Sequence, residues 1–161
     1  MGQVVSVFKN GYPGTVSRSV DDVIVSLPNL SGQTIPFGAP VFLRGTGDSV
    51  APFDAATYTD ATRFVGFAVR VPDKTPGTFG SNTAAFEPKD PVDVLVRGTL
   101  ALPMEGTCNP GVPVYLRISD GKLTASAGSA GSTILLPDVA VRGRKDVDGM
   151  AEVVVKQRHI I

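Results

Sequence analysis

The sequence has few of the residues on which enzymes and metal proteins depend. Its 161 residues include one cysteine, one histidine and no tryptophan. Cys108 has no second cysteine with which to form an internal disulfide, and the chain has no cluster of cysteines and histidines that would hold zinc. His159 lies near the end of the sequence, where a general base would be hard to orient. The composition therefore predicts no catalytic residue, no cofactor and no metal site.

The charges of the chain cancel, because 15 Lys and Arg residues balance 15 Asp and Glu residues. Without excess positive charge, a protein gains little from releasing the counterions of a phosphate backbone, so we expect no direct, sequence-specific nucleic-acid binding. The longest apolar stretches, such as Ile134–Leu136, are far shorter than the roughly 20 residues that a membrane helix needs. The N-terminus also lacks the pattern of a secretory signal. We expect a soluble protein that is made in the cytoplasm and has no membrane partner.

Glycine and proline interrupt the chain too often for long helices. The 18 Gly and 13 Pro residues leave no window free of both that is longer than 13 residues. A proline inside a helix costs roughly 3 kcal/mol and a glycine about 1 kcal/mol, so we expect at most one short helix, at residues 54–62. The valine-rich runs between these breaks predict an all-β sandwich or barrel. These runs are Val4–Phe8, Val23–Leu27, Val41–Arg44, Phe64–Val71, Val92–Leu102, Val112–Ile118, Val139–Arg142 and Ala151–Gln157.

Part of the sequence occurs twice. GAPVFLR returns as GVPVYLR with five of seven letters identical, and two further segments follow in the same order. The dipeptide Asp120-Gly121 is typical of a tight hairpin turn, and Gly47-Asp48 lies at the corresponding place in the first copy. The pattern predicts two related β units. The matching segments are 38–44 with 111–117, 68–70 with 140–142, and 94–97 with 153–156.

We interpret the chain as an N-terminal arm or edge strand over residues 1–30, followed by a β domain over residues 31–161. The repeated halves of this domain lie at about residues 35–103 and 108–157. Because one half alone has little apolar area to bury, we expect the two halves to face each other around a shared core.

The first half carries about 14 residues that the second half lacks, within Pro72–Pro91. A loop of this length in a compact domain often carries function. It contains Phe79 and Phe86, and a purely solvated loop has little use for such side chains. Two interpretations stay open: the phenylalanines contact a partner, or they fold back onto the sheet as a plug.

Four segments of the chain follow one another in a characteristic order: Ile35–Val41, Phe64–Ala68, Phe86–Gly98 and Gly111–Tyr115. Together they resemble the structural cement, or decoration, proteins of tailed-phage capsids. The similarity extends over roughly residues 30–157. The resemblance implies a non-enzymatic all-β protein that binds the outside of an icosahedral shell and stabilises contacts between major-capsid subunits.

The resemblance also implies partners and a location. The partners would be the major capsid protein and further copies of the chain, in a homo-oligomer. The location would be the capsid exterior of the virion, after synthesis in the host cytoplasm. An arm or loop that adds a strand to a neighbour's open edge would bridge subunits, which makes the N-terminal segment and Pro72–Pro91 candidates. The candidate contact residues are Phe8, Tyr12, Phe79 and Phe86.

Two other functions remain open from the sequence. A trimeric β-barrel nucleotide hydrolase of the dUTPase kind has a similar size and glycine-rich loops, but it needs a positioned carboxylate and a metal-bound nucleotide. A tail or receptor-binding β module shares the β-rich composition. No aspartate of this chain lies in a recognisable hydrolase motif, so the capsid function is the favoured hypothesis.

Overall fold

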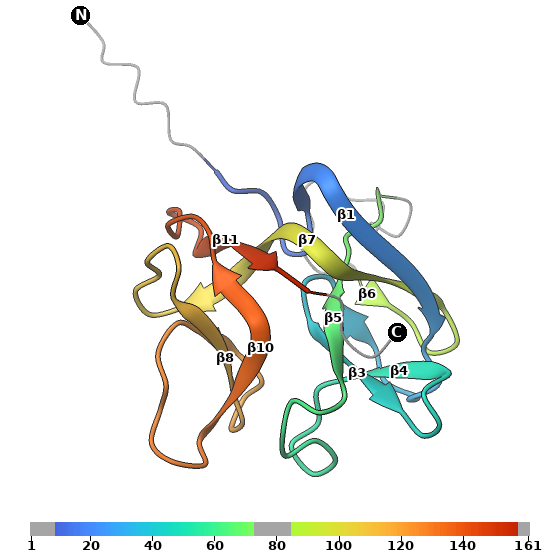
Figure 1. Ribbon diagram of the computed structural model, residues 1–161. Helices are drawn as coiled ribbons and strands as arrows, with labels where there is room; N and C mark the ends of the chain where they lie inside the picture. The colour runs from blue at the N-terminus through green and yellow to red at the C-terminus, as the bar shows by residue number, and fades with distance from the viewer. Residues whose placement is uncertain (1–8, 73–84, 158–161) are drawn as a thin grey trace, which may run out of the picture.

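The computed structural model describes residues 9–72 and 85–157 (Figure 1). Within these ranges there is no α-helix, and none of the described segments is a helix that could cross a membrane. Residues 54–62, where a short helix is expected, form turns, in which the Tyr58 amide donates to the Asp54 carbonyl at 2.8 Å. The fold is all-β, as predicted.

The strands are β1 (Val16–Pro28), β2 (Ile35–Pro36), β3 (Pro40–Arg44), β4 (Ser49–Pro52), β5 (Phe64–Ala68), β6 (Ala85–Phe86), β7 (Pro91–Glu105), β8 (Pro113–Arg117), β9 (Leu123–Thr124), β10 (Thr133–Val141) and β11 (Met150–Val155).

Five strands form a first closed ring, which we call barrel 1. The first half of β7 pairs with both β1 and β5, and β3 lies between β5 and β4. A parallel bridge between Asn29 and Val50 joins the end of β1 to β4 and closes the ring. Barrel 1 is the lobe that contains β3, β4 and β5 in Figure 1.

The second half of β7 belongs to another ring, barrel 2. Residues Gly98 to Pro103 of β7 pair with β11, and β11, β10, β8 and β9 follow one another by antiparallel pairing. The short strand β9 returns to β7 in a parallel pair, Met104 with Leu123. β7 therefore runs through both barrels, which lie side by side in Figure 1.

The hairpins of the two barrels have the same register. In barrel 1 Phe42 pairs with Ala51, and in barrel 2, at a shift of 73 residues, Tyr115 pairs with Thr124. Both hairpin turns that the dipeptides predict are therefore present in the structure.

β1 has its counterpart in the second half of β7. Leu27 pairs with Val92 in barrel 1, and Leu102 pairs with Ala151 at the equivalent place in barrel 2. The predicted strand Val23–Leu27 is part of β1, and β1 begins earlier, at Val16, so that Val16 and Arg18 also pair with β7. The residues before Val23 lie outside the predicted runs because polar and charged residues interrupt their apolar alternation.

Equivalent residues of the two halves lie in different apolar clusters. Val41 and Leu43 of β3 face the interior of barrel 1, whereas their counterparts Val114 and Leu116 of β8 face the interior of barrel 2. The halves therefore do not bury equivalent faces against each other, and the apolar cluster that they share contains one face of barrel 1 and the interior of barrel 2. A ring supplies its own facing surface, because the inward side chains of strands on opposite sides of the ring meet.

The opposite face of barrel 1 joins the two halves. Phe42, Phe64 and Phe67 point out of barrel 1 and belong to the same cluster as the interior of barrel 2. The Phe42 and Phe64 ring centroids are 5.8 Å apart, and those of Phe64 and Phe67 are 5.4 Å apart. Each of these rings is at most 1% exposed, and full burial of a phenylalanine contributes roughly 1.5–3 kcal/mol. This aromatic layer holds the two barrels in one orientation.

β7 passes from barrel 1 to barrel 2 at Gly98, where φ is 129°. Between Arg18 and Val23 the register of β1 shifts, so that residues 19–22 bulge opposite this glycine. A Cβ atom at position 98 would collide with the Asp22 carboxylate. The crossing therefore requires glycine both for its backbone conformation and for space.

The segment before Pro91 returns to barrel 1 as β6, which pairs with β2. Phe86 is 1% exposed, and its ring packs edge-on against Phe37 with the centroids 5.3 Å apart. Phe86 therefore lies in the core of barrel 1. Phe79 and the predicted strand Val4–Phe8 lie outside the described residues.

We predict that Gly66→Ala destabilises the fold severely. In β5 a Cβ at position 66 would collide with the backbone carbonyl of Leu95 on β7. The free energy of unfolding should therefore fall by about 3 kcal/mol or more. Gly106→Ala is the control, because the nearest atom lies 4.0 Å from its Cβ and only its φ of 72° is unfavourable, which costs about 1–2 kcal/mol. Chemical denaturation measures both values. Equal losses of unfolding free energy in the two variants would show that the close approach of β5 to β7 does not exclude a side chain at position 66.

We also predict a low pKa for Asp120 at the turn after β8. Arg117 donates from Nε to Oδ1 at 2.9 Å, and this hydrogen bonding, against some desolvation, lowers the pKa of Asp120 to about 2. Because the folded-state pKa is the lower one, the stabilisation is present above pH about 4 and is lost as the pH falls toward 2. NMR titration should show the pKa rise toward about 3.9 in Arg117→Ala. An unchanged pKa would mean that Arg117 is not the cause.

Candidate partner-binding site

An aromatic stack lies where the N-terminal segment crosses barrel 1. The guanidinium carbon of Arg70 lies 4.9 Å from the ring centroid of Tyr12 and 5.6 Å from that of Phe37. Phe37 in turn packs against Phe86. We call these four residues the Tyr12 stack. The structure thus connects two of the sequence-predicted contact residues, Tyr12 at the surface and Phe86 in the core, through Phe37 and Arg70.

Gly14 holds the Tyr12 stack in place. Its amide donates to the Ala101 carbonyl at 2.9 Å, and its carbonyl accepts from the Arg70 amide at 2.9 Å. Its φ is 77°, and a Cβ there would lie 2.7 Å from the Ala68 carbonyl and 2.8 Å from the Gly38 amide. The segment after Tyr12 therefore lies tightly against both halves of the molecule.

Among the described residues, Arg70 contacts the rings of Tyr12 and Phe37. Within the described residues its buried Nη1 atom has no hydrogen-bond partner. A guanidinium over an aromatic ring gains about 0.5–2 kcal/mol, more when it is shielded from water. Tyr12 is 49% exposed, and its ring covers this cation. Tyr12 therefore presents an aromatic surface whose position is fixed by the underlying Arg70.

The residues before Tyr12 are anchored to the loop between β10 and β11. Lys9 Nζ lies 2.9 Å from an Asp148 carboxylate oxygen, and the Asn10 amide donates to Asp146 Oδ2 at 2.7 Å. Asp146 also accepts from the amides of Asp148 and Met150, both at 2.9 Å. Burial acts to raise the pKa of Asp146, but the backbone donors prevail and the pKa lies below its usual value. Lys9 and Asn10 are therefore both fixed to this loop.

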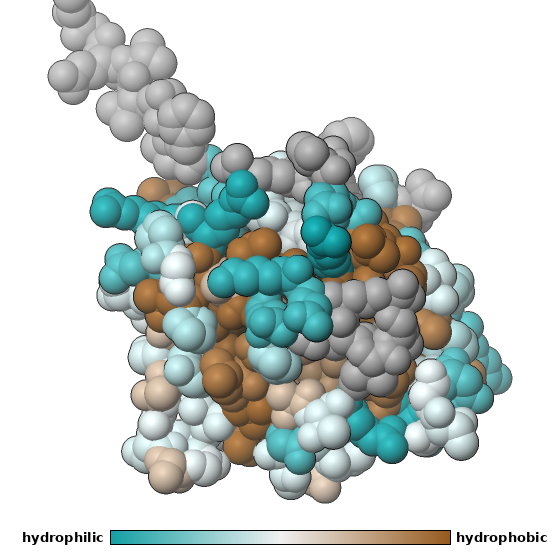
Figure 2. Space-filling view, viewed as in Figure 1, coloured by the Kyte–Doolittle hydropathy of each residue, from teal (hydrophilic) through white to brown (hydrophobic). Residues whose placement is uncertain are grey.

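Two adjoining hollows flank this anchored segment. The larger, of about 490 Å³, lies between the Pro36–Pro40 turn of barrel 1 and the end of β7 in barrel 2. The second, of about 420 Å³, lies between Tyr12 and Met150, and both hollows share Asp148 in their walls. On the face that Figure 2 shows, apolar side chains also reach the surface among polar ones.

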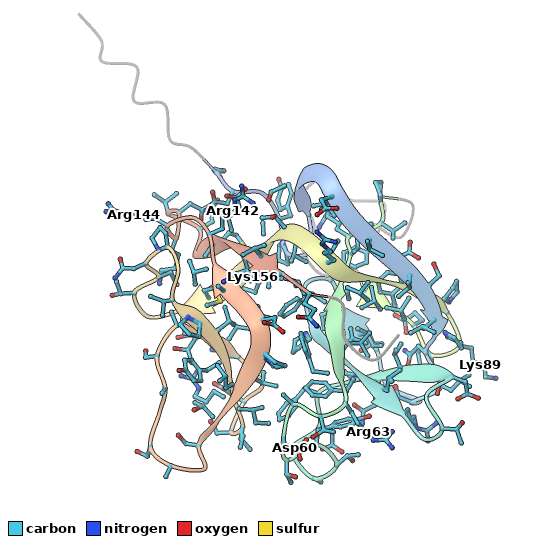
Figure 3. All side chains as sticks on the ribbon, viewed as in Figure 1. Asp60, Arg63, Lys89, Arg142, Arg144 and Lys156 are labelled. Atoms are coloured by element: carbon cyan, nitrogen blue, oxygen red, sulfur yellow. The ribbon has the colours of Figure 1, made fainter. Side chains whose placement is uncertain are left out.

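A third hollow, of about 390 Å³, carries charges of both signs at the junction of the barrels. Arg142 and Lys156, labelled in Figure 3, line it together with Asp21, Asp22 and Arg97. Arg97 already forms an ion pair with Asp21. Because the charges are mixed, this hollow does not have the single-sign field that an anion or cation site requires.

Three arginines lie at or just after strand ends: Arg44 in β3, Arg117 in β8 and Arg142 after β10. Arg44 donates to the Leu30 carbonyl, Arg117 pairs with Asp120, and Arg142 donates to Thr99 at 3.4 Å. Each therefore has a local partner.

The described residues contain no group of three or more His, Cys, Asp or Glu side chains that could hold a metal ion. Cys108 is 4% exposed, and burial raises the pKa of its thiol. Both features make it a poor nucleophile.

The structure places the predicted contact residues in different environments. Tyr12 is exposed and Phe86 is buried, while Phe8 and Phe79 lie outside the described residues. Sequence reasoning overlooked Val147, which is 74% exposed at the tip of the loop that Asp146 holds. An apolar residue inside an Asp-Val-Asp-Gly turn was the signal available for it.

Comparison with known proteins identifies the family. The family model described as structural cement protein (E217 gp24/Pam3 gp6) matches residues 3–156, which is nearly the whole chain. The chain belongs to the phage structural cement proteins. No curated protein matches this cement protein.

A solved structure has the same fold. The cement protein is similar to a chain in "The capsid of Myoviridae Phage XM1", with a TM-score of 0.70 and 18% sequence identity. The match covers 98% of this chain and 96% of the other. At this identity the likeness establishes that the two chains share their fold.

We predict that Asp146→Ala loosens the anchored segment of the cement protein. Three backbone donors lose a charged acceptor, which should cost roughly 1.5–3 kcal/mol at pH 7, whereas Asp148→Ala removes an exposed ion pair worth about 0–1 kcal/mol. Since the folded-state pKa of Asp146 is lowered, its stabilisation is present above pH about 4 and declines below it. Denaturation at pH 7 and pH 3 measures the difference. Similar effects of the two substitutions at pH 7 would contradict this role.

Proposed function

We propose that this cement protein binds the outside of an icosahedral phage capsid and stabilises contacts between major-capsid subunits, without catalysis. The observation that carries the proposal is the family match over residues 3–156. The architecture supports it, because two closed barrels on one continuous strand form a stiff body that can transmit load between neighbouring subunits. The nucleotide-hydrolase and tail-module hypotheses have no comparable support.

The Tyr12 stack is the contact surface that we propose within the described residues. Tyrosine is enriched at protein interfaces because it offers a large ring at little entropic cost, together with a hydroxyl group. Tyr12 rests on Arg70 and Phe37, so little freedom is lost when a partner covers it. Phe86 would act from beneath by fixing Phe37. Phe8 and Phe79 remain proposed contacts for the capsid.

Modest binding by each copy is sufficient for this function. On a shell, contacts between neighbouring copies raise the effective concentration at the next site, so the assembled coat binds more tightly than one copy does. We therefore propose that the partners are the major capsid protein and further copies of the chain, and that the location is the exterior of the virion. Synthesis in the host cytoplasm belongs to the same proposal.

Binding to bare, expanded capsids tests the function. The protein should add in a fixed ratio and raise the melting temperature of the shells. Tyr12→Ala should weaken binding by about tenfold or more, since an interface hot spot contributes about 2 kcal/mol or more. Leu135→Ala is the control, because Leu135 is 52% exposed but lies on barrel 2, away from the Tyr12 stack.

The outcomes separate the two parts of this proposal. No addition of the unchanged protein to any shell would refute the cement function. Normal addition of Tyr12→Ala would leave the function intact and remove the Tyr12 stack from the contact surface.

A further inference from the structure

The larger hollow has the features of a groove for an apolar chain segment. Its volume of about 490 Å³ lies within the roughly 300–1,000 Å³ range of ligand sites. Three prolines line it, and proline has no amide hydrogen that an occupant must satisfy. We call it the proline groove. Its apolar lining consists of Pro36, Phe37, Ala39, Pro40, Pro103, Met104 and Leu123.

Charged pairs mark the rim of the proline groove. Lys122 Nζ lies 3.2 Å from a carboxylate oxygen of Glu105, and both residues line the groove. Asp148, another lining residue, binds Lys9 at 2.9 Å. The first described residue of the chain is therefore held at the rim of the groove.

The eight residues before Lys9 suit the groove by composition. They read MGQVVSVF and carry no charged side chain, while Val4, Val5, Val7 and Phe8 are apolar. Full burial of such side chains contributes roughly 1.5–3 kcal/mol each. Eight residues span about 26 Å at about 3.3 Å each, which is enough to reach an adjacent molecule.

We infer that the proline groove of one copy holds residues 1–8 of a second copy, and that the exchange is reciprocal. Lys9, the residue that follows the segment, binds Asp148, which also lines the groove. Two copies related by a two-fold axis that meet at this loop would each place their segment at the entrance of the other's groove. Exchange of an identical element is a low-cost route to a dimer, because each surface already exists in the monomer.

A second copy is a better source of the segment than the same molecule. Lys9 and Asn10 are both tied to the loop between β10 and β11, so a segment that fills the groove of its own molecule has to bend into it within the few residues next to Lys9. Val4–Phe8 contains no glycine, proline, asparagine or aspartate, and Ser6 is its one residue of a type that favours turns. Its valines favour an extended chain. The inference concerns contacts between copies and goes beyond capsid binding.

Cross-linking between distinguishable copies tests the exchange. One copy carries Val5→Cys, the other carries Pro103→Cys in the groove, and the two are mixed in equal amounts with a short bis-maleimide. Cys108 can stay, because it is 4% exposed. We expect a product of twice the chain mass, in at least tenfold excess over a mixture of Val5→Cys with Ser129→Cys, which places the thiol on an exposed loop of barrel 2.

A chain with both Val5→Cys and Pro103→Cys reveals the source of the segment. Under the exchange, cross-linking of this double variant gives product of twice the mass, which decreases on dilution. A product of single mass that persists on dilution would show that the segment occupies its own groove, and would overturn the inference. The absence of any product above the control would overturn it too. Capsid addition is measured separately, so failure here leaves the cement function untouched.

Discussion

Both barrels depend on the pairing of one strand, β7, along its 15 residues. Its first half pairs with β1 and β5, and its second half pairs with β11 and β9. A ring leaves few strand edges open to stray pairing, and a strand common to two rings prevents them from separating without breaking both. Gly98 makes this possible, because its φ of 129° is a conformation that other residues rarely adopt, and the Asp22 side chain in the bulge of β1 packs where a Cβ would lie.

This construction suits a protein whose work is mechanical. Each barrel has its own interior, and the aromatic layer of Phe42, Phe64 and Phe67 removes freedom between them. The N-terminal segment is fastened to both halves, at Asp146 in barrel 2 and through Gly14 to Arg70 in barrel 1. Tyr12 and the proline groove therefore keep a fixed geometry, which preorganises them for the partners that we propose.

The sequence repeat located the hairpins but not the faces of the strands. By letters, Ala68–Arg70 matches Ala140–Arg142 at a shift of 72 residues. By pairing, Pro40 opposes Phe67 and Pro113 opposes Ala140, which is a shift of 73. A slip of one residue moves every side chain of a strand to its other face. The letters alone therefore could not show that each half closes on itself.

By itself the sequence determined the all-β class, the hairpin turns and the absence of long helices, because these follow from local alternation and from the positions of glycine and proline. The cement family was also recognisable from the order of its segments. Only the tertiary structure decided that β1 belongs to barrel 1, that Phe86 is buried and that Tyr12 rests on Arg70. These facts depend on contacts between residues far apart in the chain, and no local pattern of side chains specifies which distant strand will lie beside another.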